Sequence, residues 1–268
     1  MAAPPHLPAP DYPGSFVERV DTWMQASGRQ VTAIAGLQGT GKSTLAAQLE
    51  RRATGRGERL AVLSIDDFYL GRRERLKLGR EVHPLLATRG PPGTHDVTLA
   101  CEVIDALVAG HTVRLPRFDK IADRRLPPSR WPRIAADRVL LEGWFLKVPA
   151  QSPDQLAEPV NALERTEDPD GTWRTWCNRA LAEDYPALWR RLPWLLFLRG
   201  PGFETVPAWR WQQEQSLQAA NPRRATMSRP QVDRFVRLFE RVSRHALATL
   251  PTIAQHTVRL DALRRPLD

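Results

Sequence analysis

Residues 31–49, VTAIAGLQGTGKSTLAAQL, contain the stretch that determines the fold. Within them, residues 36–43 read GLQGTGKS and fill every fixed position of the phosphate-binding pattern G-x-x-x-x-G-K-[ST]. The apolar run 31–35 predicts a buried strand, and apolar residues at helical spacing follow the glycines. A strand, a glycine turn and a helix aim consecutive backbone N–H groups at an anion. An ordinary glycine turn would not need the complete pattern, so we predict a site for nucleotide phosphates.

The polar residues of this loop have separate expected roles. Lys42 is placed to reach the β- and γ-phosphates of a nucleotide, and the Ser43 hydroxyl is placed to ligate Mg²⁺. The residues expected to bind the nucleotide are those of the loop and the first helical turn: Gly36, Gln38, Gly39, Thr40, Gly41, Lys42, Ser43 and Thr44.

The composition is that of an ordinary globular protein, with 42% hydrophobic and 26% charged residues among 268. No run approaches 18 apolar residues, so we expect no membrane partner. The N-terminus lacks the basic and apolar regions of a secretion signal, and Cys101 and Cys177 have no metal-ligand spacing. These features predict a cytoplasmic protein without disulfides.

The chain is strongly basic, with a net charge of +9 and a pI of about 10.4. Nucleic-acid binding is one interpretation of this charge. However, the arginines are scattered along the chain, and there is no lysine-rich tail or run of mixed basic and aromatic residues. We therefore expect no nucleic-acid partner and take the short clusters at 72–73, 124–125 and 223–224 as candidate phosphate or carboxylate contacts.

Apolar strands alternate with amphipathic helices after the phosphate-binding loop, which predicts an α/β, three-layer P-loop NTPase fold with a mostly parallel central sheet. Residues 1–14 are rich in proline and predict a loosely ordered lead-in to a single domain, 15–268. Within this domain we expect a helical insertion at 149–193 and a lid at about 205–230. The polar, basic segment 70–83 is expected to be a flexible element over the site.

Acidic residues follow two of the predicted strands. The apolar run 60–65 ends in Asp66 and Asp67, at the edge where α/β sheets bind ligands. One such acid can accept a proton from a substrate hydroxyl or help to hold Mg²⁺, although helix capping is a common alternative role. Glu142 follows the apolar strand 139–141, a position where an acid would organise Mg²⁺.

Two later loops carry charged residues that suit a small anionic substrate. Arg89, His95 and Asp96 flank a Gly-Pro-Pro-Gly break before the helix expected at 99–107. Their alternative roles are structural, since Asp96 could cap that helix and a lone histidine is more often structural than catalytic. A short strand expected at 112–115 leads into the second charged loop, residues 116–125. This loop could equally be solvated surface.

The chain resembles the plant-type D-glycerate 3-kinase family, within the uridine kinase, phosphoribulokinase and pantothenate kinase group of P-loop kinases. The resemblance is carried by motifs from about residue 31 to about residue 260. They are GLQGTGKST (36–44), SIDDFYL (64–70), RGPPGTHD (89–96), PRFDKIADRR (116–125), LLEGWF (140–145), EPVNALE (158–164) and WRWQQEQ (209–215).

The resemblance implies ATP as phosphoryl donor, Mg²⁺ as cofactor, and a small hydroxy acid as substrate, with 3-phospho-D-glycerate as product. It implies catalytic roles for Lys42, Asp66 and the lid arginine Arg210, and a metal site formed by Ser43, Asp66 and Glu142. The matching positions imply that the substrate contacts are Asp67, Tyr69, Arg89, His95, Asp96 and Arg124.

Two other functions stay open at this point. A related P-loop kinase could act on a nucleoside, pantothenate or another sugar acid. A regulatory or nucleic-acid-linked P-loop NTPase would belong to another class, but the sequence has neither an N-K-x-D element nor an ABC-type signature. The sequence makes no prediction of oligomeric state.

Overall fold

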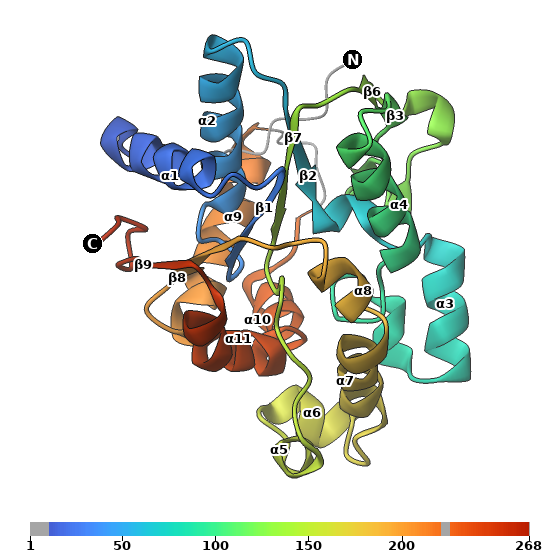
Figure 1. Ribbon diagram of the computed structural model, residues 1–268. Helices are drawn as coiled ribbons and strands as arrows, with labels where there is room; N and C mark the ends of the chain where they lie inside the picture. Colours follow the sequence, from blue (N-terminus) through green and yellow to red (C-terminus); the bar gives the residue numbers. More distant parts are fainter. Residues whose placement is uncertain (1–10, 221–225, 268) are drawn as a thin grey trace.

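The computed structural model describes residues 11–220 and 226–267 of the chain (Figure 1). Its centre is a five-stranded sheet in the order β2-β7-β1-β8-β9, in which every neighbouring pair is parallel. The strands are β1 (Val31–Gly36), β2 (Leu60–Ser64), β7 (Arg138–Gly143), β8 (Leu195–Arg199) and β9 (His256–Arg259). The predicted mostly parallel α/β sheet is therefore confirmed.

The two faces of the sheet carry separate hydrophobic cores. Helices α1 (Gly14–Ala26) and α2 (Lys42–Gly55) cover one face, and α4 (Val97–Val108) and α11 (Glu240–Ile253) contribute to the core on the other. Figure 1 shows α1 and α2 on one side of the strands and α4 on the opposite side. Burial of both faces explains the continuous apolar runs of these strands, which is typical of parallel sheets.

Strand register places three functional segments at one edge of the sheet. Ser64 of β2 lies opposite Glu142 of β7, and Gly143 of β7 lies opposite Ala35 of β1. The carboxyl ends of the three strands therefore coincide. The phosphate-binding loop, the acids after β2 and Glu142 meet at the edge where α/β proteins bind ligands.

The remaining elements connect and cover this framework. The helices are α3 (Arg72–Glu81), α5 (Pro153–Ala157), α6 (Ala162–Glu167), α7 (Thr172–Glu183), α8 (Pro186–Trp189), α9 (Val206–Ala220) and α10 (Arg229–Arg237). Short strands form two small antiparallel sheets, from β3 (Val113–Arg114) with β6 (Arg133–Ile134) and from β4 (Phe118–Asp119) with β5 (Arg124–Arg125). The 3-10 turns are η1 (Ile65–Phe68), η2 (Pro84–Ala87), η3 (Pro128–Arg130) and η4 (Phe203–Thr205). Within the described residues, no helix is long and apolar enough to cross a membrane.

The short strand expected at 112–115 is confirmed as β3, whose two paired residues belong to a small antiparallel sheet. The segment 70–83 contains helix α3, in which Arg75 is buried at 1% exposure and donates to the carbonyls of Leu70 and Ala87. The expected flexibility of this segment stays a prediction. Residues 1–10 of the expected lead-in and the arginine pair 223–224 of the expected lid lie outside the described residues.

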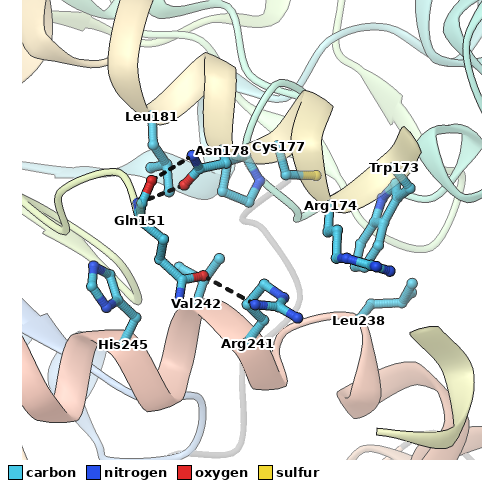
Figure 2. Close-up of a pocket in the computed structure, with 11 residues that line it drawn as sticks. Gln151, Trp173, Arg174, Cys177, Asn178, Leu181, Leu238, Arg241, Val242 and His245 are labelled. Atoms are coloured by element: carbon cyan, nitrogen blue, oxygen red, sulfur yellow. Dashed lines mark hydrogen bonds between the residues drawn. The ribbon is translucent and has the colours of Figure 1, made fainter. Parts of the chain in front are cut away.

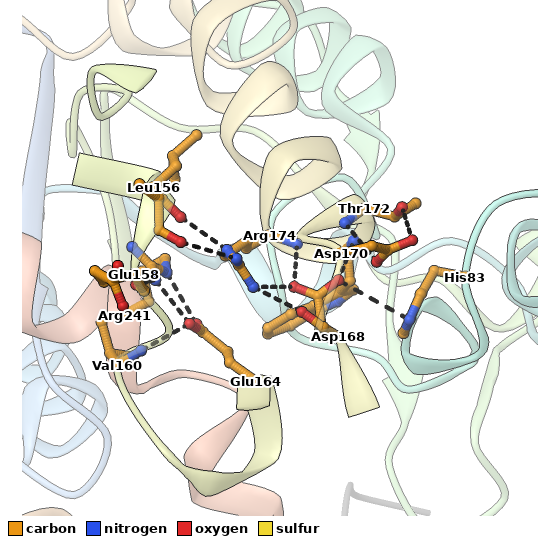
Figure 3. Close-up of polar contacts among 12 residues, drawn as sticks. His83, Leu156, Glu158, Val160, Glu164, Asp168, Asp170, Thr172, Arg174 and Arg241 are labelled. Atoms are coloured by element: carbon orange, nitrogen blue, oxygen red, sulfur yellow. Dashed lines mark hydrogen bonds and ion pairs between the residues drawn. The ribbon is translucent and has the colours of Figure 1, made fainter. Parts of the chain in front are cut away.

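Two buried ion pairs hold the segment expected to form a helical insertion (Figure 3). Arg241 of α11 makes a bidentate pair with Glu164 of α6, with contacts of 2.9 and 2.7 Å, and donates to the carbonyls of Gln155 and Glu158. Glu164 is fully buried, so its charge depends on this arginine. The last residue of the EPVNALE motif therefore ties α6 to α11.

The second pair is within the insertion itself. Arg174 of α7 donates to the Asp168 carboxylate at 3.1 Å and to its carbonyl at 2.7 Å. The same guanidinium also donates to the carbonyls of Leu156 and Ala157, the last two residues of α5. Figure 3 shows these contacts beside those of Arg241, so the two arginines together bond consecutive carbonyls at the C-terminal end of α5.

Candidate active site

The phosphate-binding loop needs glycine at its sharpest positions. A Cβ on Gly36 would lie 2.7 Å from Thr40 Oγ1 and 3.1 Å from the Leu198 carbonyl, so no side chain fits there. Gly39 has a φ of +86° and would drive a Cβ to within 2.6 Å of the Trp209 side chain. Close packing therefore requires glycine at the fixed position 36. A left-handed backbone favours glycine at the variable position 39 and at the fixed position 41, where φ is +88°.

Two polar residues of the loop differ in how they are satisfied. Thr40 is fully buried, and both its N–H and its hydroxyl donate to the carbonyl of Leu37, at 3.2 and 2.9 Å. Both amide atoms of Gln38 are buried and have no hydrogen-bond partner among the described residues. Thr40 therefore stabilises the turn, whereas Gln38 offers a donor and an acceptor that the protein does not use.

Two of the three residues expected to hold Mg²⁺, Ser43 and Glu142, lie in contact, and the metal-ligand role expected for Asp66 stays a prediction. The Ser43 hydroxyl at the start of α2 donates to Glu142 Oε1 at 2.8 Å, and Lys42 Nζ lies 4.0 Å from Glu142 Oε2. Hydroxyl and carboxylate oxygens are the donors that Mg²⁺ prefers, and in phosphotransferases it takes its other ligands from phosphates and water. The described residues contain no cluster of three His, Cys, Asp or Glu that could bind a metal alone. The donor set fits an ion shared with a nucleotide.

Asp66 lies beside this group and is held by two side chains. Lys120 Nζ lies 2.7 Å from Asp66 Oδ2, and the Tyr69 hydroxyl donates to Asp66 Oδ1 at 2.7 Å. Burial opposes ionisation of Asp66, but Lys120, Tyr69 and the nearby charge of Lys42 outweigh it and hold the pKa well below its usual range. Asp66 is therefore a carboxylate close to Lys42, and Lys120 is a functional residue that sequence reasoning missed.

Asp67 points into the loop 116–125 rather than offering a free carboxylate. Arg117 donates to Asp67 at 3.0 Å, and the Phe118 N–H donates to it at 3.2 Å. Burial raises the pKa of Asp67, and the Arg117 charge partly offsets this rise. The predicted substrate contact of Asp67 stays a prediction, while its visible role is to fasten the loop that carries Lys120.

His95 is buried at 7% exposure against Tyr185, a residue of the connection between α7 and α8. The Gly93 N–H donates to the Tyr185 hydroxyl oxygen at 3.1 Å, and His95 Nδ1 lies 2.7 Å from the same oxygen. Burial lowers the pKa of His95 to about 4, so the ring is neutral near pH 7. The Tyr185 hydroxyl and Nδ1 share one hydrogen bond, whose direction depends on the histidine tautomer. Nε2 is buried and has no partner among the described residues.

Asp96 has the capping role that we considered as an alternative. Its carboxylate accepts from the Leu99 N–H at 3.0 Å at the start of α4, and Arg125 lies 3.1 Å from its other oxygen. Arg125 also donates to the Tyr69 carbonyl at 2.9 Å. The side chain of Arg124, the arginine predicted to bind substrate, is exposed. The neighbouring Arg125 is the one that contacts Asp96, because alternate residues of a strand face opposite ways, and the substrate contact of Arg124 stays a prediction.

Arg89 and Arg210 are both engaged in contacts within the protein. Arg89 lies 2.6 Å from Asp123 and donates to the Lys120 carbonyl at 3.0 Å, so it braces the loop that carries Lys120. Arg210 of α9 lies 2.9 Å from Glu214, one helical turn further on. The expected roles of Arg89 in substrate binding and of Arg210 in the lid stay predictions.

Two cavities lie near the acceptor side of the molecule. One, of about 470 Å³, lies between α4 and α8 and is lined in part by His95, Asp96 and Tyr185. Its volume suits a small ligand, but neither Asp66 nor any residue of 36–43 lines it. The other, between α7 and α11 (Figure 2), measures about 10 Å³, which is room for about one water molecule.

Sequence comparisons identify kinases that are similar to this chain. No family model matches the chain. An uncharacterized kinase of Schizosaccharomyces pombe, mug58, is 33% identical over 201 residues, which cover 70% of this chain and 71% of the relative. The chloroplastic D-glycerate 3-kinase of Arabidopsis thaliana is 34% identical over 122 residues, covering 41% of this chain and 26% of that protein.

Solved structures support the same fold. The D-glycerate 3-kinase of Cryptococcus neoformans superimposes with a TM-score of 0.76 at 22% identity, covering 96% of this chain and 99% of the other. The chain therefore belongs to the family of P-loop kinases that includes mug58, and it is an ATP-dependent phosphotransferase that acts on an alcohol group.

Proposed function

We propose that this kinase transfers the γ-phosphoryl group of ATP to D-glycerate and releases ADP and 3-phospho-D-glycerate. The observation that carries the proposal is the position of Asp66. It is an ionised carboxylate after the end of β2, and the nearby charge of Lys42 helps to lower its pKa. A hydroxyl held by Asp66 would lie next to the phosphate-binding loop. The names of the Arabidopsis and Cryptococcus relatives support glycerate as the acceptor.

On the nucleotide side, the loop 36–43 binds the phosphates through backbone N–H groups and the N-terminus of α2. Lys42 neutralises charge on the transferring phosphoryl group. Ser43 and Glu142 hold Mg²⁺, which supplies charge neutralisation at the phosphate oxygens when bound. The unused amide of Gln38 suits a further hydrogen bond to the nucleotide.

On the acceptor side, the substrate hydroxyl oxygen attacks the γ-phosphorus while the bond to the bridging oxygen of ADP breaks. The hydroxyl proton passes to Asp66 and then to solvent. Because Lys120 lowers the pKa of Asp66, this carboxylate is a weak base and acts mainly by orienting the hydroxyl. Orientation is sufficient where the transition state is loose and proton transfer is late.

The carboxylate of the acceptor needs donors on the same side. His95 Nε2 has no hydrogen-bond partner among the described residues. Arg125 and Lys120 lie on the same side, each paired with a carboxylate of the protein. A hydroxy acid can accept hydrogen bonds from such groups through its carboxylate, which a nucleoside lacks. This difference supports a sugar acid over a nucleoside.

A panel of acceptors tests the proposal. ADP formation is measured by a coupled assay with D-glycerate, L-glycerate, uridine and pantothenate, and the product is identified by ³¹P NMR. We expect turnover with D-glycerate and a phosphate on its 3-hydroxyl. Turnover with uridine or pantothenate but not with D-glycerate would overturn the substrate. ATP hydrolysis that needs no acceptor and is stimulated by DNA or RNA would favour a regulatory NTPase.

A further inference from the structure

Two consecutive carbonyl groups of the phosphate-binding loop face away from the expected phosphates and are bonded by side chains from the two ends of the described chain. Gly39 O accepts from Arg264, 225 residues away, and Thr40 O accepts from Tyr12, 28 residues away. Neither partner belongs to the eight-residue pattern. The partners of these carbonyls also determine where the loop N–H groups point. In a trans peptide the N–H of the next residue points opposite to the carbonyl.

Tyr12 is built into the protein as a fixed donor. Its side chain is 5% exposed, and its hydroxyl lies 2.5 Å from Thr40 O. The Gln48 side chain of α2 bonds both backbone groups of Tyr12, accepting from its N–H at 3.1 Å and donating to its carbonyl at 2.9 Å. Burial raises the pKa of Tyr12 well above its usual range, so the hydroxyl keeps its proton at neutral pH.

Arg264 is the corresponding donor from the C-terminal tail. Its Nε lies 2.5 Å from Gly39 O, and its Nη2 donates to Gln212 of α9 at 3.0 Å. The guanidinium lies 5.1 Å from the ring centre of Trp209, whose own Nε1 donates to the Ala262 carbonyl at 2.9 Å. Arg264 has a φ of +65°, a left-handed backbone that only its surroundings can maintain.

We infer that Tyr12 and Arg264 are positioning residues that preset the phosphate-binding loop for nucleotide. Holding Thr40 O outward turns the Gly41 N–H inward, towards the start of α2. Holding Gly39 O outward keeps the Thr40 N–H on its bond to Leu37 O, which closes the turn. Without these contacts the empty loop would sample other peptide orientations. Nucleotide binding would then have to order the loop, and this cost would lower the affinity.

The Arg264 contacts also join the loop to α9. One guanidinium bonds the loop at Gly39, bonds α9 at Gln212 and stacks on Trp209, while Trp209 packs on Gly39 itself. Arg210 is the next residue of that helix. The tail therefore sets the position of the helix that carries the expected lid arginine relative to the nucleotide.

The inference rests on the proposed nucleotide site, and binding of ADP with Mg²⁺ tests the two separately. Affinity is measured by calorimetry for the wild type, Tyr12→Phe, Arg264→Gln and the control Arg265→Gln. Arg265 is a matched control because its side chain pairs with Asp261 in the same tail. We expect Tyr12→Phe and Arg264→Gln each to weaken ADP binding roughly five-fold, the scale of one lost hydrogen bond. Arg265→Gln should bind as the wild type does.

A kinetic readout separates positioning from general destabilisation. In Tyr12→Phe and Arg264→Gln, KM for ATP should rise by about the same factor as the Kd for ADP, and KM for the acceptor should stay constant. Tyr12→Phe keeps the ring and its contact with Phe16, so the variant retains the packing of the wild type. Arg264→Lys, which keeps a donor, should recover part of the affinity.

The outcomes are distinct. A wild-type protein that binds no ADP would overturn the nucleotide site and the inference with it. A wild type that binds ADP, with Tyr12→Phe and Arg264→Gln binding equally tightly, would overturn the inference alone. An equal loss in Arg264→Gln and Arg265→Gln would also overturn it, because the effect would then come from net charge.

Discussion

The two sides of the site are positioned in different ways. The nucleotide side, residues 36–43 with Glu142, takes its shape mainly from glycine geometry within one short stretch and from the start of α2, and the distant Tyr12 and Arg264 bond two of its carbonyls. The acceptor side comprises the loops 66–69, 89–96 and 116–125, and side chains from distant segments hold it. Tyr185 bonds Gly93 and lies against His95, about 90 residues earlier in the chain.

The insertion is one of the distant segments that hold the acceptor side. Trp176 and Ala180 of α7 and Tyr185 beyond it pack on Gly93, and Phe239 packs on Gly90 at the other end of the same loop. The buried pairs of Arg174 and Arg241 hold the insertion in place. The phosphate site is therefore specified mostly by one short stretch, whereas the proposed acceptor site depends on long-range packing throughout.

Breaking the nucleotide side should have the largest effect. Replacing Lys42 with alanine removes the cation expected on the transferring phosphoryl group, and kcat should fall by about 10³-fold. Initial rates of ADP formation at saturating substrates measure it. Lys77→Ala is the control, since Lys77 is exposed on α3 and pairs with Glu81. Wild-type turnover in Lys42→Ala would contradict the assigned role.

Breaking the support of the acceptor side should act on stability. Arg241→Met leaves the Glu164 charge buried and unpaired, which should lower the free energy of unfolding by about 3–5 kcal/mol. Arg244→Met, on the same helix, removes half-exposed pairs and should cost at most about 1 kcal/mol. Urea unfolding compares the two variants. Equal losses would show that the buried pair is no more important than a surface one.

The neutral state of His95 predicts a pH dependence. The pKa of His95 falls from 6.5 in the unfolded chain to about 4 in the folded protein, so the unfolded state binds a proton first as the pH falls. Stability that is complete above pH 6.5 should therefore be lost progressively down to pH 4, by about 2 kcal/mol between pH 7 and 5. Urea unfolding of His95→Gln should show a shallower pH dependence, and an unchanged profile would contradict the neutral buried ring.

The smallest effect should come from changing the pKa of Asp66 through its partner Lys120. Lys120 opposes the influence of burial and holds the pKa of Asp66 low, so Lys120→Met should raise it. The acid limb of kcat/KM should then move to higher pH, because Asp66 loses its charge earlier as the pH falls. A pH profile of D-glycerate phosphorylation measures the shift. An acid limb that stays in place would show that Asp66 does not control it.

Much of the nucleotide side could be predicted from the sequence because its chemistry is contiguous. The loop pattern, the buried strand before it and the acids after β2 and β7 all follow from neighbouring residues. Lys120 and Arg117 could not be assigned in this way, since each looks like a surface charge until the fold brings it to Asp66 or Asp67.

The same limit applies to two residues of the acceptor side. Arg124 and Arg125 are indistinguishable in sequence, and only the β4–β5 pairing determines which one faces Asp96. The EPVNALE motif carries part of the resemblance to the glycerate kinase family. Its Glu164 and Asn161 bond α11 and the end of α10, a structural role that composition and periodicity cannot distinguish from a catalytic one.

The central claim is that nucleotide and acceptor meet at Asp66. The most direct test compares wild-type protein with Asp66→Asn in D-glycerate-dependent ADP formation and in ADP binding by calorimetry. We predict that kcat falls by about 10²-fold, because the amide no longer orients the hydroxyl as an acceptor of its proton, while the Kd for ADP with Mg²⁺ stays within about two-fold. Wild-type turnover in Asp66→Asn, or a loss of ADP affinity that accounts for the lost rate, would contradict the claim.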